Sequence, residues 1–362
     1  MSALGTLRTS LSPDLGLDLG TSNTVVYGRG AGAIVSEPTV IAYDARRSEV
    51  VAIGTEARAM EGRTPPHIRV VRPLRRGTIS DFRGAQTLVA RLVERALASH
   101  PRLAPRVVAS IPGCATDIEC KAVEQAVRAT GARWATYLTQ AVAAALGAGL
   151  DVERTRAQMI VDIGGGTTEI AIVGLAGVLA LRSVQVGGET LDAAICARLR
   201  AERFEIGPST AERIKLALGA VGRLPGRAPL VVSGRDLGAL APRTREVSET
   251  LVAEAIGDGV ARIVGAIRSV IEAAPPEVAV DLLESGITLC GGGALLCGLA
   301  HEVGARTNVP ATIAPEPLFC AAKGAGEILG SPSLLEALRP HGDRVTRWYQ
   351  SLRIGMRESY SP

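Results

Sequence analysis

Two short glycine-rich segments carry the residue types that hold a phosphate chain and a divalent cation. The first runs from Asp18 to Thr24 (Asp-Leu-Gly-Thr-Ser-Asn-Thr), and the second runs from Asp162 to Thr168 (Asp-Ile-Gly-Gly-Gly-Thr-Thr). Glycines let backbone N–H groups close on an anion, and the threonine hydroxyls add donors. Each aspartate stands where a phosphate-bound Mg²⁺ would need an oxygen ligand or an oriented water. Two copies predict a nucleotide clamped between the halves of a duplicated unit.

The residues around each segment predict the elements that position it. Apolar residues at 15–17 and 159–161 lead into the two segments, and apolar runs at 25–27 and 170–173 follow them. Each segment is therefore expected to be a tight turn between two strands. One such turn alone is as consistent with a plain hairpin as with a binding site. Strand patterns that alternate with helix patterns along the rest of the chain predict an α/β fold.

Three further stretches bear on the arrangement. Residues 140–146 predict a helix made almost wholly of small side chains, so another element should pack tightly against it. Residues 222–247 predict a small inserted sheet. A strand at 287–290 runs into three consecutive glycines, and a helix is expected to begin at Ala294.

Composition and missing motifs exclude several classes of protein. The 362 residues allow about two domains, and a net charge of +4 without a long basic run does not indicate nucleic-acid binding. Six cysteines without a Cys-x-x-Cys pair favour reduced thiols in a cytoplasmic protein. The chain has neither a Walker A lysine loop nor Gly-x-Gly-x-x-Gly after its first strand, which excludes P-loop and Rossmann sites. It shows no secretory signal or spanning segment, so membrane contact would be peripheral.

The two loops, the triple glycine after a strand and their order resemble the actin, Hsp70 and sugar-kinase superfamily. Further stretches make the chain similar to the bacterial actin homologues of the MreB/Mbl family across residues 14–329. Among these stretches are Gly-Arg-Thr-Pro at 62–65, Arg-Pro-Leu at 72–74, Gly-Thr-Ile-Ser-Asp-Phe at 77–82 and Thr-Ala-Glu-Arg-Ile-Lys at 210–215. The resemblance implies a duplicated actin-like (ribonuclease H-like) α/β fold, with ATP and Mg²⁺ in a central cleft.

The same resemblance implies two domains, each with a smaller inserted subdomain. Domain I is expected at 1–156, with an insert at about 32–75, and C-terminal helices at about 319–348 should complete it. Domain II is expected at 157–318, with an insert at about 182–249. Residues 349–362 are expected to form a basic C-terminal tail.

Roles for single residues follow from the resemblance. Asp18 and Asp162 should approach Mg²⁺ or its waters from opposite sides, and Asp162 should also take part in catalysis. Glu212 and Lys215 share a helix face and are placed on the ribose and adenine; an ion pair between them is the alternative. The remaining residues expected to bind nucleotide are Gly20, Thr21, Ser22, Asn23, Thr24, Gly164, Gly165, Gly166, Thr167, Thr168, Gly291, Gly292, Gly293 and Ala294.

Gln140 stands where the MreB pattern Glu-Glu-Pro-Met has the residue that orients the attacking water. This chain has Thr-Gln-Ala-Val at 139–142, and eukaryotic actin also has Gln-Ala-Val there. An amide can accept a hydrogen bond from water but cannot take a proton at neutral pH. Because phosphoryl transfer depends mainly on positioning and charge stabilisation, Gln140 is expected to support slow turnover tied to filament assembly.

We therefore expect an ATP-dependent bacterial actin filament that organises cell-wall synthesis and cell shape. Its expected partners are other copies of the chain and the cell-wall synthesis machinery, in the cytoplasm at the inner face of the membrane. Two segments are candidates for peripheral membrane contact, the loop around Leu103 and the stretch from Leu334 to Tyr360, which mixes arginines with apolar residues. A solvent loop and a docked C-terminal helix are the respective alternatives.

Three other functions stay open on this resemblance. A filament with another cargo, such as an organelle or a plasmid, fits the same motifs. A sugar kinase would need a carboxylate base aimed at a hexose, for which the sequence shows no motif. An Hsp70-type chaperone would need a substrate-binding domain, which is not expected in the residues after 330.

Overall fold

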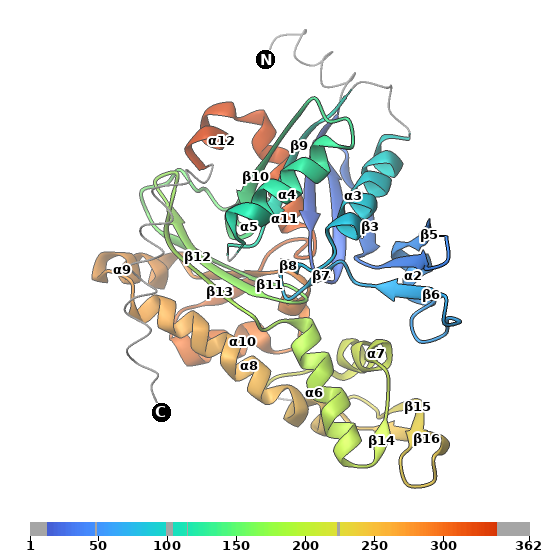
Figure 1. Ribbon diagram of the computed structural model, residues 1–362. Helices are drawn as coiled ribbons and strands as arrows, with labels where there is room; N and C mark the ends of the chain where they lie inside the picture. The colour runs from blue at the N-terminus through green and yellow to red at the C-terminus, as the bar shows by residue number, and fades with distance from the viewer. Residues whose placement is uncertain (1–12, 48, 99–103, 114, 223–224, 339–362) are drawn as a thin grey trace.

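The computed structural model describes residues 13–47, 49–98, 104–113, 115–222 and 225–338. Two five-stranded sheets form the centres of two halves, which lie side by side in Figure 1. None of the helices in the described ranges is long and apolar enough to cross a bilayer.

Sheet I has the strand order β10-β9-β1-β2-β3. Its first three strands form an antiparallel meander, and β9 and β10 run parallel to β1. Parallel neighbours need crossover connections, which α3 (Phe82–Leu97) and α4 (Asp117–Arg128) provide. The strands are β1 (Asp14–Leu19), β2 (Asn23–Gly28), β3 (Gly32–Pro38), β9 (Arg106–Ile111) and β10 (Trp134–Thr139).

Sheet II repeats this topology with the order β13-β12-β11-β17-β18. Its first three strands also form an antiparallel meander, and its last two are parallel to β11. The repeated order and directions confirm the predicted duplicated α/β fold. The strands are β11 (Gln158–Ile163), β12 (Thr168–Gly174), β13 (Gly177–Val184), β17 (Ile287–Cys290) and β18 (Ala311–Ile313).

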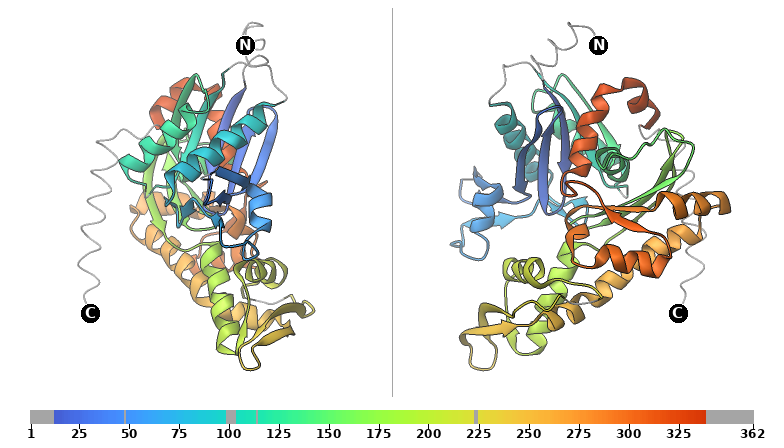
Figure 2. Two further views of the ribbon diagram at one scale, coloured as in Figure 1. Left: turned by 45° about the vertical axis from the view of Figure 1, so that its right-hand side comes forward. Right: turned by 180° about the vertical axis from the view of Figure 1, so that it is seen from behind.

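Two helices fill the space between the sheets. α5 (Gln140–Gly147) packs on β11 and β12, and α11 (Cys320–Glu327) packs on β1 and β9 (Figure 2). Their backbones touch, because a Cβ atom on Gly147 would lie 1.9 Å from the carbonyl oxygen of Cys320. This contact confirms the prediction that another element packs tightly on the small-residue helix.

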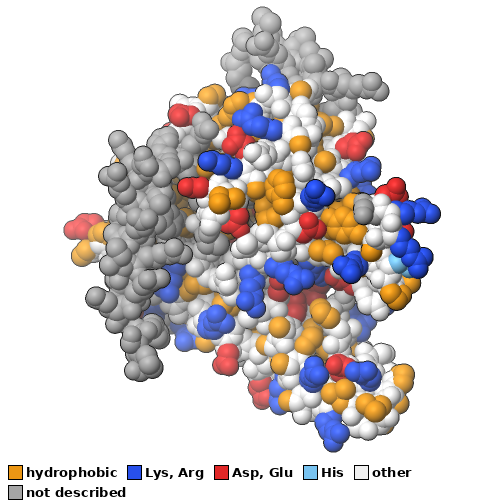
Figure 3. Space-filling view, viewed as in Figure 1, with side chains coloured by type: hydrophobic (Ala, Val, Ile, Leu, Met, Phe, Trp, Pro, Cys, Tyr) orange, Lys and Arg blue, Asp and Glu red, His pale blue; other side chains and the backbone are white. Residues whose placement is uncertain are grey.

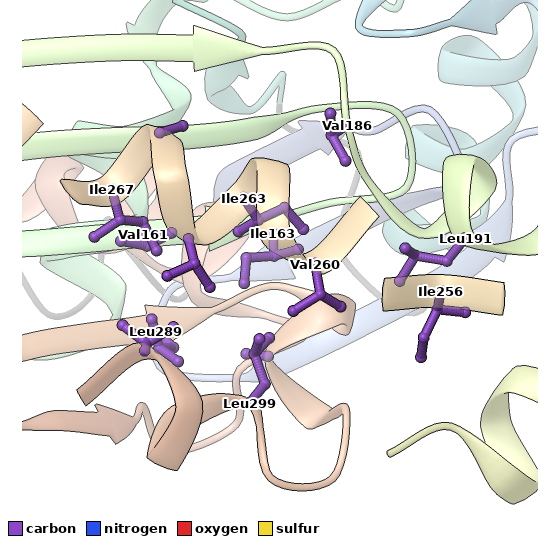
Figure 4. Close-up of a cluster of buried hydrophobic side chains, with 14 of the residues drawn as sticks. Val161, Ile163, Val186, Leu191, Ile256, Val260, Ile263, Ile267, Leu289 and Leu299 are labelled. Carbon is purple, nitrogen blue, oxygen red and sulfur yellow. The ribbon is translucent and has the colours of Figure 1, made fainter. Parts of the chain in front are cut away.

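The outer face of sheet II is covered by α8 (Glu249–Glu272) and α10 (Leu299–Thr307). Ser248 caps α8, since its side chain accepts a hydrogen bond from the backbone N–H of Leu251. One face of α8 then places an apolar residue every three or four positions against the sheet. Figure 4 shows Ile256, Val260, Ile263 and Ile267 of this face with Val161, Ile163 and Leu289 of the sheet and Leu299 of α10.

Smaller elements project from each half. Strands β15 and β16 confirm the small sheet that the sequence predicts within 222–247, and β14, which lies before that range, adds a third strand to it. Because β3 pairs with β2 in sheet I, the small sheet of the first half begins at β4; the domain and insert boundaries themselves stay predictions. These elements are β4 (Ile41–Asp44), β5 (Glu49–Ile53), α2 (Gly54–Ala59), β6 (Ile68–Val71), β7 (Leu74–Arg75), β8 (Thr78–Ile79), α6 (Gly188–Ala201), β14 (Phe204–Glu205), α7 (Pro208–Leu218), β15 (Leu230–Asp236), β16 (Ala241–Val247) and α9 (Pro276–Ser285).

The prediction that a helix begins at Ala294 is wrong. A short 3-10 helix, η1 (Gly292–Leu295), follows the strand, and α10 begins only at Leu299. Gly298 separates them with φ of +81°, a left-handed conformation that interrupts a continuous helix. At the end of the described chain, η2 (Ile328–Gly330) and α12 (Pro332–Leu338) follow α11. Leu103 and residues 339–362 lie outside the described residues.

Candidate functional site

The two glycine-rich loops close with the same turn. The backbone N–H of Gly20 donates to the carbonyl oxygen of Asn23 at 3.1 Å, and that of Gly164 donates to Thr167 at 2.9 Å. The flanking strands pair in equivalent registers, Leu19 with Thr24 and Ile163 with Thr168. The likeness seen in sequence is therefore a likeness in three dimensions.

The loops face each other between the two halves. A Cβ atom on Gly165 would lie 1.9 Å from the hydroxyl oxygen of Ser22 and 2.7 Å from its Cβ. A Cβ atom on Gly166 would lie 2.6 Å from the hydroxyl oxygen of Thr21. Only glycine permits this approach, which brings the two loops into direct contact.

Two carboxylates stand at the base of the loops, near the ends of β1 and β11. Asp18 accepts a hydrogen bond from the hydroxyl of Ser110 at 2.6 Å, and Asp162, which is buried, accepts one from Nε2 of Gln140 at 2.9 Å. Burial, followed by the charge of Asp162, raises the pKa of Asp18 to about 7. Burial also raises the pKa of Asp162 to about 6, although the hydrogen bond from Gln140 opposes this.

This pair of acids fits a divalent cation. The charge of Asp162 disfavours ionisation of Asp18, and a cation bound beside the two carboxylates would remove that penalty. No cluster of three or more His, Cys, Asp or Glu side chains within the described ranges is placed to hold a metal. A Mg²⁺ ion here would therefore keep most of its water, as this ion usually does.

The raised pKa values make a prediction about pH. A carboxyl group whose pKa is higher in the folded protein stabilises the fold at low pH, and this stabilisation is lost as pH rises through the folded value. Between pH 5.5 and 8, without nucleotide or Mg²⁺, the protein should lose about 2 kcal/mol of stability through Asp18. Urea unfolding of wild type and Asp18→Asn at several pH values measures this loss. Equal pH dependence in both proteins would contradict the assignment.

Gln140 is the first residue of α5 and is buried against the second carboxylate. Because its amide N–H donates to Asp162, its carbonyl oxygen is left as an acceptor. The geometry thus brings the predicted water-orienting residue into direct contact with a predicted metal-binding residue.

A third segment that contacts both loops was missed by sequence reasoning. Arg76 and Gly77 form the two-residue turn between β7 and β8, with φ of +51° and +78°. The N–H of Gly77 donates to the hydroxyl of Thr21 at 3.0 Å, and a Cβ on Gly77 would lie 2.9 Å from the methyl group of Thr167. An Arg-Gly pair between short strands is a turn signal, but it does not reveal what the turn will contact.

Glu212 and Lys215 do not pair with each other, so the alternative of a solvated ion pair is wrong. Lys215 donates to Asp192 at 2.9 Å and to the carbonyl oxygen of Gly188 at 3.1 Å. Glu212 forms an ion pair with Arg58 of α2, which belongs to the other half. Burial raises the pKa of Asp192 to about 6 although Lys215 opposes the shift.

The two halves also meet through other polar contacts. Arg72 lies 3.7 Å from Glu189 at the start of α6, and the N–H of Gly113 donates to Glu169 at 3.0 Å. Neither contact has a local sequence signal, because each partner is far from the other along the chain.

Two of the residues predicted to bind nucleotide have side chains that lie inside the protein. Thr24 and Thr168 are fully buried, and their hydroxyls bind Thr39 at 2.9 Å and the carbonyl oxygen of Val186 at 2.7 Å, respectively. This placement favours a role in supporting the loops. Gly291 lies close to the site, since a Cβ atom there would be 2.3 Å from a carboxylate oxygen of Asp162.

The remaining members of the triple glycine adjoin the second loop. A Cβ atom on Gly293 would lie 2.2 Å from the side chain of Ile163, and Ala294 next to it is fully buried. Gly292 has more room, because a Cβ atom there would lie 3.4 Å from the side chain of Leu318. The glycines thus allow β17 and η1 to pack against the loop that carries Asp162.

Solved structures provide one comparison. MreB5 of Spiroplasma citri bound to ADP superimposes with a TM-score of 0.83 at 31% identity, covering 88% of this chain and 96% of that one. The same protein bound to AMPPNP gives a TM-score of 0.81 at 29% identity over 95% of this chain and 99% of that one. A MamK double helical filament, at 21% identity and a TM-score of 0.73 over 87% of this chain and 98% of that one, shares the fold.

Sequence comparison provides another. The chain is 38% identical over 328 residues to the cell shape-determining protein MreB of Escherichia coli strain K12, covering 89% of this chain and 94% of that protein. It is 35% identical over 317 residues to the cell shape-determining protein Mbl of Bacillus subtilis, covering 87% and 95%. The model of the MreB/Mbl protein family matches residues 12–337. The chain therefore belongs to the MreB/Mbl protein family and has an actin-like fold.

Proposed function

We propose that this chain binds ATP with Mg²⁺ between its two halves, hydrolyses the ATP slowly and assembles into filaments that guide cell-wall synthesis and cell shape. The observation that carries the proposal is the pair of matched turns that face each other above Asp18 and Asp162. The relatives support it, since they are named cell shape-determining proteins and a solved relative was bound to ADP and to AMPPNP. These matches do not favour the sugar-kinase and chaperone alternatives.

Each part of the cleft has a role in this proposal. Backbone groups of 20–23 and 164–167 would surround the phosphates, and Asp18 and Asp162 would hold Mg²⁺ through its waters. The ion would supply positive charge to the phosphate oxygens. Glu212 would have to break its ion pair with Arg58 before it could contact the nucleoside. Nucleotide binding would therefore compete with this ion pair between the halves.

Binding and assembly are tested separately. Titration calorimetry with ATP and Mg²⁺ should show one site per chain, and negative-stain electron microscopy should show polymers that need the nucleotide. Absence of binding would remove the whole proposal, whereas binding without polymers would leave a nucleotide site and remove the filament.

Peripheral membrane contact through the Leu103 loop stays a proposal. The part of the C-terminal stretch from Leu334 to Leu338 docks on the fold as α12, with Leu335 and Leu338 buried.

Gln140→Ala is expected to slow phosphate release by about 10- to 100-fold, because the attacking water would lose an oriented acceptor and Asp162 would lose a fixed hydrogen bond. ATP affinity should change little, since the amide lies against Asp162 rather than among the loop amides. Single-turnover phosphate release measures the effect. Gln125→Ala, which alters an exposed glutamine on α4, is the matched control. Identical rates for wild type and Gln140→Ala would remove Gln140 from the mechanism.

A further inference from the structure

We propose that residues 339–362, called the tail below, dock on the outward face of α9; they include the basic segment expected at 349–362. This face comprises Glu277, Val280, Leu283 and Glu284, and it is called the α9 face below. The α9 face is remote from the two glycine-rich loops, and docking on it does not depend on the proposed function.

The α9 face combines exposed apolar and acidic side chains. Leu282 points inward and is fully buried, whereas Val280 and Leu283 are 58% and 54% exposed. Val280 and Leu283 are three residues apart, and Glu284 follows Val280 by four, so the three lie on one side of the helix. Figure 3 shows acidic and apolar side chains next to each other where this helix projects from the molecule.

The charge of α9 is unbalanced. Its residues, Pro276–Ser285, include three acids and no base. Arg156 contacts two of them, at 2.5 Å from Glu284 and 3.9 Å from Asp281. Glu277 has no ion pair within the described part of the chain. A basic and apolar segment would therefore complement this helix in both charge and polarity.

The described chain ends on the same side of the molecule. α12 ends at Leu338 and packs against β13, whose preceding turn contains Leu175. The N–H of Leu175 donates to the carbonyl oxygen of Arg154 at 2.7 Å, and Arg156, two residues further, binds α9. Leu175 is 64% exposed, so this route from α12 to α9 has an apolar residue midway. Figure 1 shows the β12–β13 turn between the two helices.

The tail has the composition that such a surface requires. Its 24 residues contain five arginines, one aspartate and one glutamate, which gives a net charge of +3 with His341 neutral. Its apolar residues include Val345, Trp348, Leu352 and Ile354. An extended chain spans about 3.3 Å per residue, so even half of this segment reaches across several helices. Arginine–carboxylate pairs and burial of Trp348 would hold it on the α9 face.

Tryptophan fluorescence tests the proposal in the full chain, which contains two tryptophans. In a Trp134→Phe background Trp348 is the sole reporter. We expect its emission to be blue-shifted and its quenching by acrylamide to be at least 3-fold weaker than in a synthetic peptide of residues 339–362. Glu277→Arg with Glu284→Arg should give peptide-like values. Adding Arg353→Glu and Arg357→Glu should restore protection, whereas Glu56→Arg with Glu94→Arg in the first half should leave it unchanged.

Hydrogen exchange gives a second measurement without the Trp134 change. Amide protection of α9 should be lower in a truncated chain of residues 1–338 than in the full chain. Four results would overturn the proposal: peptide-like quenching in the unmutated tail, protection unaffected by the α9 reversals, protection that rises with protein concentration, and protection that needs anionic phosphatidylglycerol vesicles. The third would identify a second copy as the occupant, and the fourth a membrane.

Discussion

Gly165→Val is expected to weaken ATP binding by about 100-fold or more while both halves stay folded. The new Cβ would lie 1.9 Å from the hydroxyl oxygen of Ser22 and 2.7 Å from its Cβ, so the two loops could not approach as they do now. The clash lies between the halves, and opening of the cleft relieves it without disturbing either sheet. A nucleotide held from both sides would then lose the groups of one side.

Calorimetric titration with ATP and Mg²⁺ measures this loss, and circular dichroism checks that the fold is retained. Gly207→Val is the matched control, because a Cβ at Gly207 meets nothing within 4 Å. If Gly165→Val bound ATP as tightly as wild type, the clamp between the two loops would not be the nucleotide site.

The second large effect is expected from Gly324→Ala, which should destabilise the protein by about 3–5 kcal/mol. A Cβ atom there would lie 1.8 Å from the carbonyl oxygen of Ala143 and 2.7 Å from the backbone nitrogen of Gly147. Both are backbone atoms, so α5 and α11 would have to separate. Because these helices lie between the two sheets, separation would disturb packing in both halves.

Urea unfolding measures the change as a shift in midpoint. Gly265→Ala on α8 is the matched control, since a Cβ there meets nothing within 4 Å and alanine favours helix over glycine by about 1 kcal/mol. The two substitutions make the same chemical change in helices and should have opposite signs. A stable Gly324→Ala protein would show that the two helices do not need their close contact.

Local patterns were sufficient to predict the elements that carry the site. Both glycine-rich turns lie between strands in register, as the apolar runs beside them indicate. The small-residue stretch from Gln140 predicted a tightly packed helix, and α5 meets α11 backbone to backbone. These predictions succeed because the residues concerned are close in sequence, and their side-chain size and backbone preferences act within one turn or one strand.

Long-range partners could not be obtained in the same way. Glu212 and Lys215 have opposite charges and lie three residues apart on one helix, which favours an ion pair between them. Instead, Glu212 pairs with Arg58 and Lys215 pairs with Asp192. The start of α10 at Leu299 was missed because Gly298 adopts a left-handed conformation against Val221, a contact that no local pattern encodes. Tertiary packing outweighed local preference in each case.

The sequence by itself determined that this chain has two equivalent turns, each with an aspartate before its glycines. Only the tertiary structure decided that Gln140 binds Asp162, that Ser110 binds Asp18 and that the two loops meet. The physical reason is that burial and the pairing of distant groups depend on how the two sheets and the helices between them pack. A carboxylate acquires its raised pKa from those surroundings, and its own stretch of chain does not contain them.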